Sequence, residues 1–157
     1  MPLDFTLTIE IPESLRRRLE PAVLQGAVVK GMQKAVLSVV RRAKLNLSGR
    51  FLRVGHGRLR SSVTSTVLIA GNEIVGQVGT NVFYGRIHEE GVPHSWVIRP
   101  RTRPRLAFRV GGKWITAMAV THPPLRRRPW LRTAALESQA EIRAQFQAEV
   151  TQAIGNG

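Results

Sequence analysis

The chain has 157 residues, which is enough for one folded domain with a sizeable core. Apolar residues make up 43% of it, so the chain is not intrinsically disordered, and no run reaches the roughly 18 apolar residues that a membrane span requires. The absence of cysteine excludes disulfides and thiolate metal sites, and the N-terminal residues lack the pattern of a secretion signal, so we expect none.

The distribution of charge is more informative than the formal net charge of +14. Residues 21–72 contain nine basic residues and no acidic residue, and residues 91–136 contain ten basic residues and no acidic residue. Such segregation predicts large positive surfaces that need an anionic partner or neighbouring acidic surfaces. One interpretation is contact with DNA. The other, which we favour, is complementary contact between protein surfaces together with solvated arginines.

The first elements are a strand and a long helix. Phe5, Leu7, Ile9 and Ile11 alternate with polar residues, which predicts a half-buried strand. From Leu24 onward, apolar residues recur every three or four positions and predict one face of a long helix that ends near Ser48 and Gly49. This face consists of Leu24, Val28, Met32, Val36, Val40, Ala43 and Leu47. The basic residues of the same helix, on one side of it, are Lys30, Lys34, Arg41 and Lys44.

A hairpin and a short helix are expected next. Residues 57–61 predict a short helical turn that leads into a strand containing Val63, Val67 and Ile69. Gly71 and Asn72 supply a hairpin turn, and residues 74–79 return. Thr80 or Asn81 caps a short helix through Glu90, and Gly91 takes a left-handed conformation at its C-terminal end.

Residues 92–124 predict a protruding β-hairpin insertion together with a basic connector. Residues 105–110 and 113–120 flank a turn at Gly111 and Gly112. Leu106, Phe108 and Val110 share one face of the first strand, whereas Arg105 and Arg109 point to the other. Residues 95–100 add a third strand. Because two apolar strands are unstable alone, we expect the insertion to pack against another molecule.

The C-terminal part predicts one helix. Pro123, Pro124 and the arginines at 126–128 form a stiff connector, and Pro129 opens a helix that continues to Ile154. Its apolar stripe is Leu131, Ala135, Ile142, Phe146, Val150 and Ala153. Its acidic stripe, made of Glu137, Glu141 and Glu149, is the counterpart of the basic helix face, within one subunit or between neighbours. We therefore predict a single α+β domain over residues 1–157, with an antiparallel sheet packed against a long N-terminal helix, the hairpin insertion and a C-terminal helix.

No residue pattern predicts an enzyme, a cofactor site or a metal site. His88, Glu89, Glu90 and His94 are the best metal candidates, but they lack the H-E-x-x-H spacing and any thiol, so we expect a capped helix end with solvated carboxylates. Asp4 is the only aspartate, and no G-x-S-x-G or P-loop motif occurs. The three tryptophans at 96, 114 and 130 are more typical of a core or an interface than of base stacking.

Three short motifs and a His-Pro pair occur in a fixed order along residues 45–140. The motif positions are Gly57, Arg58, Leu59 and Arg60; Gly79, Thr80, Asn81, Tyr84, Glu89 and Gly91; His122 and Pro123; and Arg128, Pro129, Trp130 and Leu131. Together they resemble the head–tail joining proteins, also called neck, minor tail or tail-completion proteins, of long-tailed, siphophage-type bacteriophages. Those proteins usually carry Pro-Gly after the histidine, so the Pro-Pro here predicts a stiffer linker.

The resemblance implies a structural virion protein that forms a homo-oligomeric ring at the head–tail junction and is present in the host cytoplasm during assembly. A hexamer is the natural expectation from tail symmetry. Implied partners are head-closure or portal-side proteins on one side and tail terminator or tail-tube proteins on the other, without a membrane. A tail terminator or minor tail protein is the alternative within this class, and a free basic nucleic-acid-binding protein is the alternative outside it.

Two sets of residues are candidates for contacts. The expected subunit interface consists of Lys30, Lys34, Arg41, Lys44, Leu106, Phe108, Trp114, Met118, Glu137, Glu141 and Glu149. The expected contacts with a partner, or with packaged DNA in a channel, are Arg99, Arg101, Arg103, Arg105, Arg126, Arg127 and Arg128. Because strong phosphate pairing would hold DNA that has to slide, we expect most of these arginines to contact protein, and any DNA contact to be non-specific.

Overall fold

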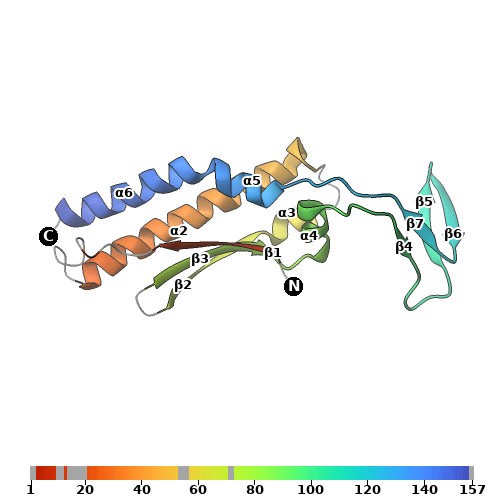
Figure 1. Ribbon diagram of the computed structural model, residues 1–157, viewed down its shortest axis with the longest axis horizontal. Helices are drawn as coiled ribbons and strands as arrows, with labels where there is room; N and C mark the ends of the chain where they lie inside the picture. The colour runs from red at the N-terminus through yellow and green to blue at the C-terminus, as the bar shows by residue number, and fades with distance from the viewer. Residues whose placement is uncertain (1–2, 10–12, 14–20, 53–56, 71–72, 156–157) are drawn as a thin grey trace.

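The computed structural model describes residues 3–9, 13, 21–52, 57–70 and 73–155 and has the predicted α+β architecture (Figure 1). Ile11, Gly71 and Asn72, which entered the strand and turn predictions, lie outside these residues. The elements in chain order are β1 Leu3–Ile9, α2 Pro21–Leu45, the π-helical turn η1 Asn46–Arg50, α3 Arg58–Ser62, β2 Thr64–Ala70, β3 Glu73–Thr80, α4 Phe83–Glu90, β4 Trp96–Ile98, β5 Leu106–Val110, β6 Lys113–Ala117, β7 Val120–His122, α5 Trp130–Glu137 and α6 Gln139–Gly155.

The sheet is antiparallel and has the strand order β1-β3-β2. Val78 of β3 lies opposite Phe5 of β1 and Ser65 of β2, and the face that carries it packs on α2. Helix and strand approach closely at Gly76, because a Cβ atom there would lie 2.5 Å from the Sδ atom of Met32. A glycine in the central strand is thus explained by the contact with α2.

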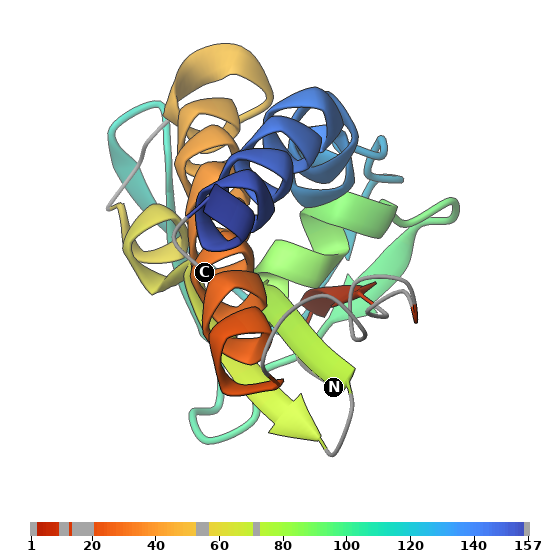
Figure 2. The same cartoon turned by 90° about the vertical axis from the view of Figure 1, so that its left-hand side faces the viewer.

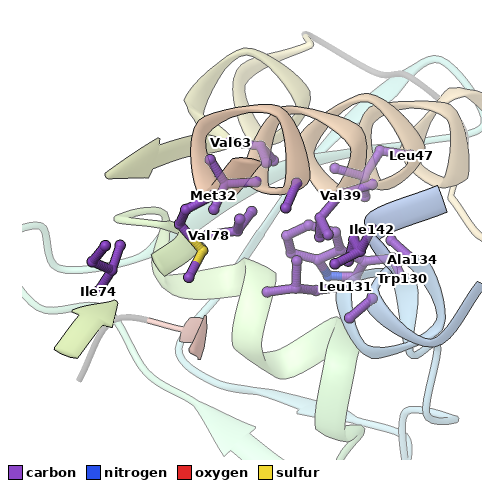
Figure 3. Packing of buried hydrophobic residues seen from close by; sticks show 14 of the residues in the cluster. Met32, Val39, Leu47, Val63, Ile74, Val78, Trp130, Leu131, Ala134 and Ile142 are labelled. Carbon is purple, nitrogen blue, oxygen red and sulfur yellow. The ribbon is translucent and has the colours of Figure 1, made fainter. Parts of the chain in front are cut away.

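Helix α2 forms the centre of the fold, between the sheet and α6 (Figures 1 and 2). All seven residues of the predicted apolar face contribute to the core, and only Val40 among them is partly exposed. Met32, Val39, Trp130 and Leu131 belong to one buried cluster (Figure 3). By length and hydropathy the segment Ala22–Arg50 could cross a membrane, but the core helix of a soluble protein passes the same test. In the most apolar 18-residue window of this segment, 56% is buried inside the protein.

The long helix ends in the π-helical turn η1, which the apolar spacing did not predict. Gly49 has φ of 126°, so the helix terminates close to the expected residue. Asn46 is buried in this turn and donates a hydrogen bond from Nδ2 to the carbonyl oxygen of Trp130, 2.8 Å away. The end of α2 is therefore tied to the start of α5.

Residues 92–124 project from the helices and the three-stranded sheet and are called the arm; the rest of the described chain is called the body (Figure 1). Strands β5 and β6 form the predicted hairpin, and both turn glycines, Gly111 and Gly112, have positive φ as a two-residue turn requires. The predicted third strand, β4, exists but pairs with β7 instead of the hairpin. The predicted return strand 113–120 is split into β6 and β7.

The C-terminal segment forms two helices where one was predicted. The helices α5 and α6 meet at Ser138, which is fully buried and donates its hydroxyl to the carbonyl oxygen of Ala134, 2.7 Å away. A serine that bonds its own preceding turn commonly bends a helix, and the apolar spacing does not report this. The acidic and apolar stripes nevertheless fall on the expected sides, and Gly31 of α2 packs directly against Phe146 of α6.

Candidate interaction site at the root of the arm

The three sequence motifs, which are far apart in the chain, meet in one place. Gly85 of α4 is surrounded by all three, because a Cβ atom there would lie 2.8 Å from Leu59 Cδ1, 2.9 Å from Thr80 Cγ2 and 3.6 Å from Trp130 Cζ2. Trp130 is 0% exposed, and its Nε1 donates to the carbonyl oxygen of Gly85 at 3.1 Å. We call this group of residues, 57–63, 78–91 and 128–131, the motif cluster.

Glu89 binds the start of α5. Its carboxylate accepts hydrogen bonds from the backbone amides of Leu131, at 2.8 Å, and Arg132, at 2.9 Å. A helix N-terminus has unpaired backbone amides and the positive end of the helix dipole. A carboxylate there accepts hydrogen bonds from the amides and interacts favourably with the dipole. The prediction that Glu89 is solvated is wrong, since the residue is only 5% exposed. Glu90 is exposed, as expected, and accepts a hydrogen bond from Arg86.

The start of α4 differs from the prediction. The helix begins at Phe83 with Val82 in the cap position, and no side chain caps it. Thr80 accepts a hydrogen bond from the amide of Val82 at 3.1 Å and shares another with the hydroxyl of Ser62 at 2.6 Å. Thr80 therefore holds the turn between β3 and α4 instead of capping the helix, and Asn81 is exposed.

The two strands of the arm are held together where they leave the body. Val92 and Leu125 exchange two backbone hydrogen bonds of 2.9 Å, and the amide of Arg128 donates to the carbonyl oxygen of His88 at 2.7 Å. Gly91 has the expected positive φ of 73°, but its ψ of −179° is not left-handed helical. A Cβ atom at Gly91 would lie 2.7 Å from the amide nitrogen of Arg127, so only glycine fits beside the returning chain.

His88 is half-buried, and its buried Nδ1 atom has no hydrogen-bond partner among the described residues. Burial lowers the pKa of its imidazole below the usual value, and the positive charge of Arg128 lowers it further. Its ring contacts Tyr84 edge to face. No group of three or more metal-ligating side chains occurs within the described ranges of the chain.

The arm exposes apolar and basic side chains. Trp114 is 69% exposed, and the guanidinium of Arg109 lies over its ring, 5.4 Å from the centroid. The strand register places Leu106 and Phe108 on the opposite face of the hairpin, so the predicted apolar contact set does not form one surface. In the β4–β7 pair, Trp96 stacks on His122 with ring centroids 4.1 Å apart.

The arginines of the arm and the connector are exposed and unpaired. In the part of the chain that the structure describes, none of them forms an ion pair. They include the seven predicted contact residues, Arg99, Arg101, Arg103, Arg105, Arg126, Arg127 and Arg128, and also Arg109. Arg127 alone donates to a backbone oxygen, that of Glu89, at 3.3 Å.

The acidic stripe of the C-terminal helices pairs with the basic face of α2 within the chain. Glu149 binds Lys34, and Glu141 binds Arg41 at 2.6 Å. Lys30 and Lys44 form no ion pair with another described residue. The residues of this stripe and of α2 that do pair thus hold the body together and are not evidence of a subunit interface.

Two further arginines, which sequence reasoning missed, join this network. Arg50 donates two hydrogen bonds to Glu137, at 2.8 and 2.9 Å, and Arg42 lies 3.7 Å from the same carboxylate. The hydrogen bonds from Arg50 lower the pKa of the Glu137 carboxyl below its usual value, and the charges of Arg50 and Arg42 act in the same direction. Arg50 follows the end of the predicted helix, so helical spacing could not place it beside Glu137.

The motif cluster is a mechanical junction. Thr80, Glu89 and the indole of Trp130 hold the starts of α4 and α5, and Glu89, the one charged buried side chain of the cluster, is occupied by backbone amides. Comparison of the chain with protein-family models, curated proteins and solved structures returns no match. Family membership is therefore a proposal that depends on the motifs and on their arrangement.

Proposed function

We propose that this protein is a structural component of the head–tail connector of a long-tailed bacteriophage, a neck or tail-completion protein. In this proposal it assembles as a ring, with six copies as the expectation from tail symmetry. The ring joins the portal-side closure proteins to the tail. It needs no cofactor and catalyses no reaction.

The convergence of the motifs at Gly85 is the observation that carries this proposal. Short motifs that resemble a family by chance should be scattered over a fold. Here residues from three separate segments, Leu59, Thr80 and Trp130, contact one glycine. The same cluster includes Glu89 and Gly91, which hold α5 and the returning strand of the arm. These buried motif residues therefore share one task, which is to fix the arm on the body.

The division into body and arm suits a joining protein. A ring forms when one surface of a subunit contacts a different surface of the next and the rotation closes. The body offers such surfaces, with exposed side chains such as Phe83, which is 80% exposed, and Leu37. The arm extends beyond the body, so it can reach a neighbouring subunit or the adjoining ring (Figure 1).

The two alternative functions, another phage tail protein and a free nucleic-acid-binding protein, differ in which observations favour them. A tail terminator or minor tail protein would use the same ring and arm, and only its position in the virion differs. A free nucleic-acid-binding protein is favoured by the unpaired arginines of the arm, because phosphates would neutralise them. The buried motif cluster does not favour it, since nucleic-acid recognition requires exposed side chains.

Mass photometry and negative-stain microscopy of the purified protein test the proposal. We expect a closed ring of identical subunits at low salt. The control is the Glu90→Gln variant, which removes an exposed carboxylate of the motif cluster and should form the same ring. A strictly monomeric protein that binds duplex DNA would contradict the proposal and favour the nucleic-acid-binding alternative.

A further inference from the structure

The arm carries unpaired positive charge together with exposed apolar side chains. We propose that it docks on an acidic protein surface with an apolar hollow, and that this surface belongs to a different molecule and not to a second copy of this chain. The inference deepens the proposed function, because it identifies the chemistry of the partner that the arm would join.

The charge of the arm requires a partner rich in acidic residues. The arm together with the connector that follows it, residues 92–128, contains nine basic residues and no acidic residue. None of these nine forms an ion pair with another residue of the described ranges. Buried in an interface, such guanidinium groups need opposite charges, since an uncompensated buried charge is strongly destabilising.

A second copy of the chain is a poor source of acidic groups. Most carboxylates of the body are engaged: Glu141 and Glu149 bind basic residues of α2. Glu137 binds Arg50 of η1, and Glu89 binds backbone amides. Glu90, the neighbour of Glu89, already accepts from Arg86.

The apolar side chains favour a protein over a nucleic acid. The large exposed apolar residues of the arm are Val97, Ile98, Val110, Trp114, Ile115 and Met118. Phosphate pairing uses only the basic residues and would leave these side chains in water. Burial of apolar surface drives protein association, and tryptophan, methionine and arginine are enriched in protein interfaces.

Fluorescence of Trp114 tests the inference directly. Trp130 is fully buried and Trp96 is stacked on His122, so quenching by acrylamide should report mainly on Trp114, which a Trp114→Phe variant can verify. The probes are a synthetic peptide of alternating glutamate and leucine, poly-glutamate of the same charge, and a DNA duplex of the same charge. All three are titrated into the full-length protein at physiological ionic strength.

We expect the alternating peptide to protect Trp114 and to bind at least about tenfold more tightly than poly-glutamate or the duplex, a difference of about 1.4 kcal/mol. The triple variant Arg101→Ser, Arg103→Ser, Arg105→Ser should weaken peptide binding by at least that factor. The matched control Lys30→Ser, Lys44→Ser, Arg143→Ser removes the same charge from the body and should leave it unchanged. For the apolar contribution, Met118→Ser is compared with Leu37→Ala, an exposed apolar residue on α2.

Absence of peptide binding, equal effects of the two triple variants, or tighter binding of the duplex would each overturn the inference. A second measurement addresses self-association. Replacing residues 94–123 by a short glycine-serine linker keeps the Val92–Leu125 bridge, and the number of subunits per particle should not change. A smaller particle would show that the arm joins copies of this chain. That result would overturn the inference while the proposed function, tested by ring formation of the intact chain, stands.

Discussion

The Glu89→Gln substitution tests the mechanical role of the motif cluster. Glutamine has the size of glutamate but only one acceptor oxygen. It can serve the amide of Leu131 or that of Arg132, which lie 2.8 and 2.9 Å from the present carboxylate oxygens, but not both. The substitution also removes the negative charge from the N-terminal end of α5. We therefore expect the start of α5, and with it Trp130, to be destabilised.

The size of this effect follows from the geometry. A buried amide left without an acceptor costs about 1–3 kcal/mol. Loss of a charge at a helix N-terminus costs about 0.3–1 kcal/mol when it is exposed and up to about 2 kcal/mol when it is partly buried. Glu89 is 5% exposed, so the larger value of about 2 kcal/mol applies, and the sum is about 3–5 kcal/mol. In a domain of this size each kcal/mol lowers Tm by about 2–4 °C.

The assay is urea unfolding followed by far-UV circular dichroism, with near-UV circular dichroism as the report on Trp130. The control is Glu90→Gln, one residue away, where the carboxylate is exposed and bound only to Arg86. Exposed pairs contribute little to stability, so this variant should unfold like the unmodified protein. If both variants unfold at the same urea concentration, Glu89 does not hold α5 and the reasoning about the motif cluster is refuted.

Three further predictions concern charge. Reversing Glu137, Glu141 and Glu149 to lysine should prevent folding of the body, measured by circular dichroism, because all three face basic residues of α2 and η1; a folded variant at low salt would contradict the pairing. Lowering the pH should destabilise the protein below about 6.5, because burial holds the folded-state pKa of His88 below the value of 6.5 in the unfolded chain, so the unfolded state binds more protons. The contribution of His88 to stability is complete above that pH and declines as the pH falls toward the folded-state pKa. In thermal scans, His88→Gln should make Tm less dependent on pH, and substitution of the exposed His94 by glutamine should not. The same pH dependence of Tm in both variants would contradict the role of His88. Binding of duplex DNA, measured by fluorescence anisotropy, should be weak, independent of sequence and lost steeply with salt; sequence-specific binding that survives about 0.2 M salt would favour the nucleic-acid-binding alternative.

Periodic features of the sequence predicted the body well. The apolar spacing from Leu24 to Leu47 reports which side of α2 is buried, because that side repeats with the helical period. The hairpin of β5 and β6 followed from two glycines between apolar strands, and both adopt positive φ. These signals come from residues close together in the sequence, so they can be recognised without knowing how distant segments pack.

Contacts between distant segments were not predictable in the same way. Glu89 lies 42 residues from its partner Leu131, and nothing in the helical period of α4 distinguishes it from Glu90. One signal was present: α5 begins after Pro129, which has no side-chain acceptor, so its free amides needed one from elsewhere. The pairing of β4 with β7 and the position of Arg50 beside Glu137 are likewise set by how the segments pack.

Electron microscopy of phage particles made with and without this protein tests the central claim most directly. The account predicts that disruption of its gene in the encoding phage leaves filled heads and free tails, and that the intact chain supplied in trans restores joined particles. The variant in which a linker replaces residues 94–123 should form rings without restoring joining. Complete virions in the absence of the protein would contradict the account.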